Sequence, residues 1–211
     1  MQADSVKASK PSNKGTGRLF DNPLLEKLTR THILVPISIL SIAAISVMGY
    51  GIYYSIIPAI LAPVYFLLGM LTFTLIEYLI HRYLFHIPAT NEKRAKFQHF
   101  VHGIHHDYPK DKDRLAMPPL ASALLSVGFF YLFSFLMGNA AFGFFPGFIF
   151  GYIAYLGVHY VVHAYQPPKN ILKWLWIYHG MHHYKYPNAY FGVSSPLWDY
   201  VFRTIPKEEK N

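Results

Sequence analysis

Long apolar runs alternate with charged segments along this chain. The apolar runs cover residues 33–51, 56–80, 119–137 and 142–162. A helix needs about 20 apolar residues to cross the hydrocarbon core of a bilayer, and each run comes close to that length or exceeds it. The link between the first two runs and the link between the last two are short and uncharged. The pattern therefore predicts an all-α integral membrane protein whose four transmembrane helices form two hairpins.

The composition favours the same class of protein. The 211 residues are 53% hydrophobic and 14% charged, whereas a soluble domain has roughly 25% charged residues. Lipid is therefore the expected solvent for much of the surface. The chain has no cysteine, which excludes disulfides, thiolate metal sites and iron–sulfur clusters. Any bound metal must use histidine, carboxylate or water as its ligands.

Three parts of the chain are expected to differ in order. The start of the chain is rich in Lys, Ser, Ala and Gly, so residues 1–20 are predicted to be a disordered tail without a cleavable signal peptide. The membrane domain is expected to cover residues 21–205. A charged tail follows over residues 206–211.

A short helix is predicted ahead of the first apolar run. A capping side chain followed by Pro23 indicates a helix start, so we expect a helix over residues 22–31. Leu24, Leu25 and Leu28 share one side of it. The helix is either amphipathic and embedded in the membrane interface, or a solvated cap.

The positions of the basic residues predict the orientation of the chain. Of the 19 Lys and Arg, six precede the first apolar run, seven lie between the second and third, and six follow the fourth. Neither hairpin tip carries one, so by the positive-inside rule both termini and residues 81–118 face the cytoplasm. The formal net charge of +8 is thus a topology signal and a contact for anionic lipid, and we expect no nucleic-acid partner. The chain is expected to be a multi-pass protein of a bacterial inner membrane or the endoplasmic reticulum.

Ten of the twelve histidines lie in four closely spaced clusters at the cytoplasmic ends of these helices or next to them. The spacings are HxxxxH, HxxHH, HxxxH and again HxxHH, for the residues His81, His86, His102, His105, His106, His159, His163, His179, His182 and His183. On a helix, HxxHH directs three imidazoles from one face, and neutral imidazole is a common metal ligand. Ten imidazoles exceed the four to six donors that one transition metal accepts, so the spacings predict more than one metal ion.

One histidine pair leaves two alternatives open. On a continuous α-helix, five residues correspond to a rotation of about 140° from the starting direction. Either the helix loosens before Pro88, or His81 and His86 bind different metal ions.

Acidic residues and the remaining histidines are candidates for contacts with the ligand imidazoles. Glu77 lies in an apolar run one turn before His81, where we expect it to accept an N–H from an imidazole. The same role is considered for His99, Asp107, Asp111, Asp113 and Asp199. His99 could instead be an eleventh ligand, the three loop aspartates a solvated charge cluster, and Asp199 a helix cap. His32 is interpreted as an interface residue.

Four segments resemble the fatty acid hydroxylase superfamily, and within it the fatty acid 2-hydroxylases that act on ceramide-type acyl chains. They are HRYLFH (81–86), HGIHHDYPKDKDRLAMPP (102–119), HYVVH (159–163) and YHGMHHYKYPNAYFGVSSPLWDYVFRT (178–204). The resemblance covers about residues 18–205. It implies a four-span helix bundle whose cytoplasmic helical cap holds a dinuclear metal site, with the ten clustered histidines as ligands.

The resemblance also implies a reaction. The expected activity is hydroxylation of C2 of a long acyl chain, free or in ceramide, with O2, two electrons and two iron ions. Zinc can occupy such a site in isolated protein. Eukaryotic relatives often carry a fused cytochrome b5 domain, which this sequence lacks ahead of the helix at 22–31. We therefore expect a separate electron donor of the cytochrome b5 or ferredoxin type, or a truncated sequence.

Other functions remain open from the sequence alone. A sterol desaturase or hydroxylase and a carotenoid hydroxylase share HxxHH clusters. A divalent-metal transporter would need ligands near the middle of the bilayer, whereas these histidines lie at helix ends. A bis-imidazole haem protein fits the adjacent His–His pairs poorly.

Overall fold

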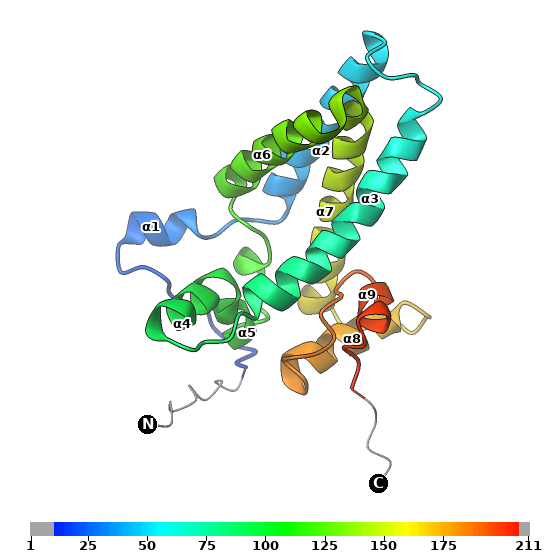
Figure 1. Cartoon of the computed structure of the whole chain (residues 1–211). Helices are drawn as coiled ribbons and strands as arrows, with labels where there is room; N and C mark the ends of the chain where they lie inside the picture. The colour runs from blue at the N-terminus through cyan, green and yellow to red at the C-terminus, as the bar shows by residue number, and fades with distance from the viewer. Residues whose placement is uncertain (1–10, 207–211) are drawn as a thin grey trace.

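The computed structural model describes residues 11–206, and this part of the chain is helical without strands (Figure 1). The expected tail residues 1–10 and 207–211 lie outside the described residues. Four long helices dominate the structure: α2 (Leu34–Tyr53), α3 (Ala62–Leu79), α6 (Pro119–Met137) and α7 (Ala141–Ala164). They correspond to the four predicted apolar runs. The second helix begins later than predicted, because Pro63 lies in its first turn and residues 54–61 form the preceding turns.

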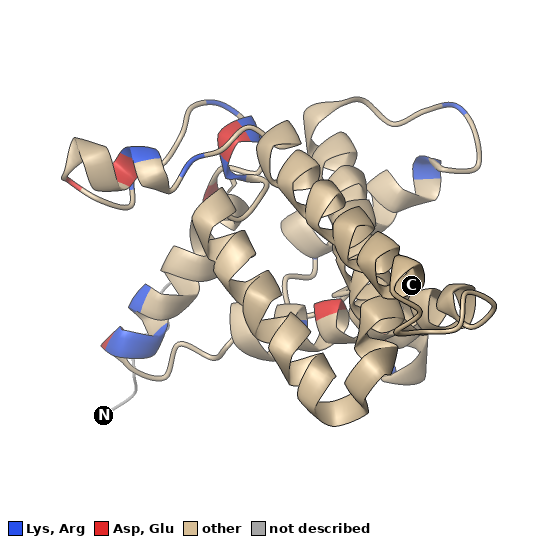
Figure 2. Cartoon of the chain, turned by 90° about the horizontal axis from the view of Figure 1, so that it is seen from above, with Lys and Arg blue, Asp and Glu red and all other residues tan. Residues whose placement is uncertain are grey.

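Three helical runs are long and apolar enough to cross a membrane. They cover residues 34–53, 62–85 and 112–164. The third run contains both α6 and α7, joined by the 3₁₀ turn η4 (Gly138–Ala140). Lys and Arg lie outside the four long helices, as Figure 2 shows. The length and composition of these runs indicate a membrane protein.

Helices α3 and α7 pack against each other through glycines. A Cβ atom added to Gly147 would lie 1.9 Å from the carbonyl oxygen of Phe66, and one added to Gly69 would lie 2.0 Å from that of Phe144. Only glycine allows the two backbones to approach this closely. Phenylalanines then fill the space around the contact, and Phe148 packs edge-on against Phe73 with 5.3 Å between ring centroids.

Shorter helices gather at one end of the long helices (Figure 1). We call the described residues 11–31, 80–118 and 165–206 the cap. Its α-helices are α1 (Pro23–Leu28), α4 (Glu92–Gln98), α5 (Ile104–Asp107), α8 (Lys173–Tyr184) and α9 (Leu197–Val201). Two π-helical turns, η1 (Ile80–Phe85) and η2 (His99–Gly103), and the 3₁₀ turn η3 (Lys112–Arg114) complete the list.

The N-terminal described segment differs from the expected disordered tail. Residues 11–20 contact other parts of the cap, and the Ser12 N–H donates to the carbonyl oxygen of Asp107 at 2.8 Å. The Tyr184 hydroxyl donates to the Asn13 side chain at 2.8 Å. These contacts join the segment to the residues that directly follow the two HxxHH clusters.

The predicted helix at 22–31 forms as the shorter α1. The Asn22 side chain accepts from the N–H groups of Leu24 and Leu25, as expected of a capping residue. Leu24 and Leu28 are 73% and 68% exposed. The apolar side of α1 therefore faces away from the protein.

A buried carboxylate, which the sequence did not single out, joins α1 to the rest of the cap. Glu26 accepts from the N–H groups of Leu19 and Phe20 at 2.9 and 3.2 Å and pairs with Arg30 and Arg114. Burial alone would raise its pKa, but these hydrogen bonds and the positive charges outweigh burial and lower the pKa to about 2. Glu26 is therefore ionised at neutral pH.

Candidate metal centre

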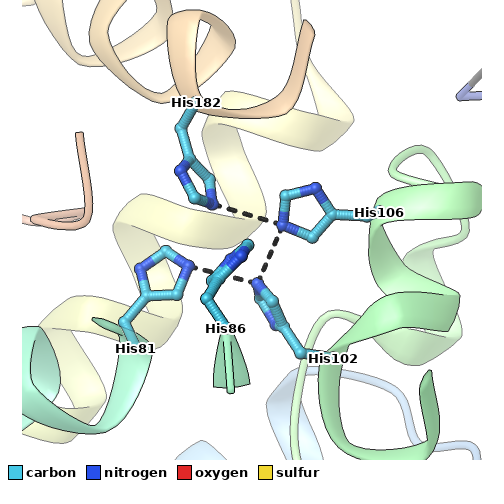
Figure 3. Close-up of side chains that lie close together, drawn as sticks. All are labelled: His81, His86, His102, His106 and His182. Atoms are coloured by element: carbon cyan, nitrogen blue, oxygen red, sulfur yellow. Dashed lines mark hydrogen bonds between the residues drawn. The ribbon is translucent and has the colours of Figure 1, made fainter. Parts of the chain in front are cut away.

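The ten clustered histidines come together in two groups of five. Within each group, one ring nitrogen of every residue lies within 4.8 Å of the others. Group A contains His81, His86, His102, His106 and His182, and their rings converge in Figure 3. Group B contains His105, His159, His163, His179 and His183. The sequence predicted these ten residues, and the fold divides them equally.

A π-helical turn brings His81 and His86 into the same group. The N–H of His86 donates to the carbonyl oxygen of His81 at 3.1 Å, which is the i→i+5 pairing of a π-helix. Because a π-helical turn contains more residues than an α-helical turn, it brings His86 back to the side of the helix that carries His81. The sequence left open whether the helix loosens or the two residues separate, and the helix loosens.

The paired histidines of each HxxHH cluster diverge. His106 joins His102 in group A, whereas its neighbour His105 belongs to group B. In α8, His182 lies in group A and His183 in group B. Consecutive residues on a helix point about 100° apart, so a His–His pair can serve two adjacent groups. Both clusters therefore contribute to both groups.

Hydrogen bonds fix where the protons lie in group A. The Nδ1 atoms of His81 and His182 lie 2.6 and 2.7 Å from the carbonyl oxygens of Phe191 and Ala189. A carbonyl oxygen only accepts, so both Nδ1 atoms carry hydrogen and both neutral rings direct the Nε2 lone pair inward.

Neighbouring Nε2 atoms of group A lie within hydrogen-bonding distance of one another. The Nε2 atom of His102 lies 3.1 Å from that of His81 and 3.0 Å from that of His106, and His106 lies 3.2 Å from His182 (Figure 3). Converging lone pairs repel unless a cation or a proton lies between them. The donor set of group A therefore fits a metal ion that binds imidazole.

Group B has the same arrangement of Nε2 atoms. The Nε2 atom of His105 lies 3.0 Å from that of His159 and 3.1 Å from that of His183. His179 lies 2.8 Å from His163 and 3.1 Å from His183. All five residues are buried, and group B fits a second ion.

Burial keeps these imidazoles neutral. Desolvation, together with the neighbouring imidazoles, lowers the pKa of His86 to about 2 and that of His106 to about 3. The pKa values of His179, His182 and His183 are lowered well below their ordinary value for the same reasons. A metal ion requires the neutral form, so the ligand nitrogens are in the required state at neutral pH.

Glu77 and Asp199 contact a loop and not the ligand imidazoles expected from the sequence. Glu77 accepts from the N–H groups of Val193 and Ser194 at 2.9 and 3.1 Å. Asp199 accepts from the N–H groups of Phe191 and Gly192 at 2.9 and 2.7 Å. Both carboxylates therefore bind the backbone of residues 191–194, and the carbonyl oxygen of Phe191 in this stretch contacts His81 of group A.

His99 and its acidic neighbour lie outside both groups. The Nδ1 atom of His99 lies 3.6 Å from a carboxylate oxygen of Asp107, and the His99 side chain is half exposed. This geometry does not place His99 among the ligand nitrogens.

Asp111 and Asp113 hold the cap together. Asp111 pairs with Arg30 and Arg114 at 3.4 and 3.6 Å. The carbonyl oxygen of Asp113 accepts from the N–H of Thr31 at 2.9 Å. Asp111 is therefore part of an ion-pair network and is not the solvated charge that the sequence left as an alternative.

A cavity of about 250 Å³ lies beside group B. His163, His179 and His183 form part of its wall, together with Lys110 and Trp176. The Lys110 ammonium donates to the carbonyl oxygen of His163 at 2.8 Å. Group B is therefore next to space that a small molecule or part of a larger one can enter.

Comparisons with known proteins agree with this geometry. A protein-family model described as "Fatty acid hydroxylase" matches residues 66–204. The chain is 37% identical over 198 residues to a dihydroceramide fatty acyl 2-hydroxylase of Arabidopsis thaliana, covering 90% of this chain and 80% of the relative. It is 43% identical over 149 residues to a fatty acid 2-hydroxylase of Rattus norvegicus, covering 68% of this chain and 40% of the relative.

A solved structure is also similar. It is described as full-length scs7p in which only the hydroxylase domain is visible, with 36% identity and a TM-score of 0.81. The similarity covers 93% of this chain and 74% of that one. The chain spans 40% of the length of the rat relative and 57% of that of a human fatty acid 2-hydroxylase.

Proposed function

Because this chain belongs to the fatty acid hydroxylase family, we propose that it hydroxylates C2 of a long acyl chain, free or in ceramide or another sphingolipid. The reaction uses O2 and two electrons at a pair of metal ions. The observation that carries the proposal is the pair of five-histidine groups, each with its ring nitrogens converged. The relatives are named as hydroxylases of fatty acids and of dihydroceramide fatty acyl chains, and these names supply the substrate class.

Groups A and B are proposed to hold one iron ion each, with zinc as an alternative occupant of isolated protein. Bound iron supplies the redox chemistry that activates O2. The role of the protein is to orient the ligand nitrogens, to keep them neutral, and to place one carbon of the substrate within reach of the metal positions.

Aromatic side chains exclude water from the ligand nitrogens. The ring of Phe85 stacks on His102 with 4.9 Å between centroids and an angle of 19°. Tyr155 stacks on His159 at 5.4 Å and 10°. These apolar surfaces also keep the rings from rotating, so the nitrogens stay directed toward the metal positions.

We place the chain in the membrane with four spans in two hairpins, and with the termini and the cap in the cytoplasm. Single cysteines test this arrangement, because the natural chain has none. Ser55 and Asn139 lie at the two hairpin tips, and Glu92 lies in the cap. In sealed inside-out vesicles, a membrane-impermeant maleimide should label E92C and spare S55C and N139C. Labelling at either tip contradicts the proposed topology.

The two electrons are proposed to come from a cytochrome b5-type or ferredoxin-type donor. The cavity beside group B is lined by Lys110, and residues 164–198 carry three lysines without an acidic residue. The excess of basic over acidic residues in this part of the cap favours an acidic donor. High salt should therefore slow reduction by the donor without changing the metal content.

Lipid mass spectrometry on cells that express the chain, supplied with a compatible reductase system, tests the reaction. The expected product is an acyl chain with one added oxygen, placed at C2 by fragmentation, and absent from cells that express His106→Ala. Oxygen at another position refutes C2 specificity. Modified sterols or carotenoids would assign the chain to a sister activity, and altered metal uptake without an oxidised product would favour a transporter.

A further inference from the structure

One loop contacts two histidines of group A through its backbone. Residues 189–194 form the stretch that we call the acceptor loop. The carbonyl oxygen of Ala189 accepts from His182, and that of Phe191 accepts from His81. The position of this loop therefore decides the proton position and the ring orientation of both histidines.

Two buried carboxylates hold the acceptor loop by its N–H groups. Four consecutive residues, from Phe191 to Ser194, donate their backbone N–H to Asp199 or Glu77. The Ser194 hydroxyl adds a bond of 2.6 Å to Glu77. Asp199 is fully buried and Glu77 is 8% exposed, so both sets of hydrogen bonds are shielded from water.

Glycine is required where the loop meets Asp199. A Cβ atom on Gly192 would lie 2.2 Å from the carbonyl oxygen of Ser195 and 2.8 Å from a carboxylate oxygen of Asp199. Any larger residue must move the loop away from the carboxylate. Gly192, Asp199 and Glu77 thus determine one loop position together.

Within the described residues, three of the five imidazoles of group B lack such a carbonyl partner. The Nδ1 atoms of His105, His179 and His183 are buried and make no hydrogen bond within residues 11–206. His159 approaches the carbonyl oxygen of Leu115 at 3.3 Å, which is a long contact. The imidazoles of group B are therefore less firmly oriented than His81 and His182.

We infer that Glu77 and Asp199 are positioning residues that act through the acceptor loop on group A, and that the two metal positions differ in consequence. Group A binds its ion more tightly, and group B, which adjoins the cavity, binds the more exchangeable ion. This inference rests on the proposed function only in taking both groups as metal sites. It does not depend on the substrate.

Zinc titration of the purified full chain in detergent, against a competing chelator, tests the inference. His179→Ala disables group B and leaves group A to be measured, whereas His182→Ala disables group A and leaves group B. We expect the His179→Ala protein to bind zinc at least 10-fold more tightly than the His182→Ala protein. Adding Glu77→Gln or Asp199→Asn should weaken group A about 10–100-fold, the usual effect of losing an indirect metal contact. The same additions should change group B less than twofold.

Glu26→Gln is the matched control, because Glu26 is also buried and also accepts from two backbone N–H groups. It should leave the zinc affinity of group A unchanged. Circular dichroism and gel filtration identify folded variants, and Ser194→Ala, which removes one donor to Glu77, provides a milder variant with a loss of a few fold. Unchanged group A affinity in folded Glu77→Gln, Asp199→Asn and Ser194→Ala proteins, or equal losses in both groups, overturns the inference. If these zinc results hold but no acyl chain is hydroxylated, only the proposed function fails.

Discussion

His105 and His106 are neighbours in the chain, yet each belongs to a different group of histidines. The Nε2 atom of His105 lies 3.1 Å from that of His183, and the Nε2 atom of His106 lies 3.0 Å from that of His102. The rings of His106 and His183 then stack with 4.2 Å between centroids, across the boundary between the groups. The two groups are therefore in direct contact, although each has its own set of converging nitrogens.

Pairs of substitutions should reveal which histidines share an ion. His106→Ala should remove most of one ion per chain, abolish turnover and lower the melting temperature, because metal binding is coupled to folding. Adding His182→Ala, from the same group, should cost no further metal. Adding His183→Ala, from the other group, should remove the second ion. Elemental analysis of purified protein measures each ratio.

His99→Ala is the control for these variants, because His99 lies outside both groups. It should retain the metal content and the activity of the parent protein. Equal metal loss in the two double variants would contradict the assignment of the histidines to two groups.

The close contact between α3 and α7 should tolerate no side chain. Gly147→Ala places a methyl group against the carbonyl oxygen of Phe66 and should destabilise the protein by about 1–3 kcal/mol, the usual cost of overpacking. Gly157→Ala lies on the same helix, and a Cβ atom there has no neighbour within 4 Å. It should be neutral or stabilising by up to about 1 kcal/mol. Thermal unfolding in detergent compares the two, and equal melting temperatures would contradict the tight contact.

Periodicity and composition were sufficient to predict the long helices and to single out the ten histidines that converge in groups A and B. Membrane helices need long apolar runs, and the ten histidines stand out because neither a core nor a solvated helix face requires imidazole. The π-helical turn η1 (Ile80–Phe85), which follows α3, was less predictable, because no sequence pattern of its own distinguishes it from an α-helical turn. The division of each His–His pair also required the fold.

The hydrogen bonds that orient the ligand histidines could not be predicted from the sequence, because their partners are backbone groups. His81 and His182 donate to backbone carbonyl oxygens. Every residue carries such an oxygen, whatever its side chain, so the sequence does not mark these acceptors. Glu77 was singled out as an acid in an apolar run and expected to accept from an imidazole, but its partners are the backbone N–H groups of Val193 and Ser194, more than 100 positions along the chain. Such pairings depend on tertiary structure.

Acid should destabilise the cap through Glu26. The carboxyl has its ordinary pKa of about 4.5 in the unfolded chain and about 2 in the folded chain. Between these values the unfolded chain binds more protons, so the contribution of Glu26 to stability is complete above about pH 4.5 and is lost as the pH falls toward 2. Glu26→Gln should lower the melting temperature at neutral pH.

The difference in melting temperature between the wild type and Glu26→Gln isolates the contribution of Glu26, because both proteins contain the same histidines. It should shrink steadily when melting temperatures are measured from pH 5 downward. A difference that stays constant over this range would show that the Glu26 charge does not stabilise the cap.

Helix α1 should lie in the membrane interface. Leu24, Leu25 and Leu28 are 47–73% exposed on one helix, an arrangement that leaves apolar side chains in water unless lipid covers them. A spin label at Leu24→Cys in liposomes should be accessible to dissolved oxygen, which partitions into lipid, and protected from a water-soluble nickel complex. The control is Glu92→Cys, whose parent side chain is 80% exposed in a charged pair, and which should show the opposite pattern. Similar nickel accessibility at the two positions would make α1 a solvated cap and remove it from the membrane-binding surface.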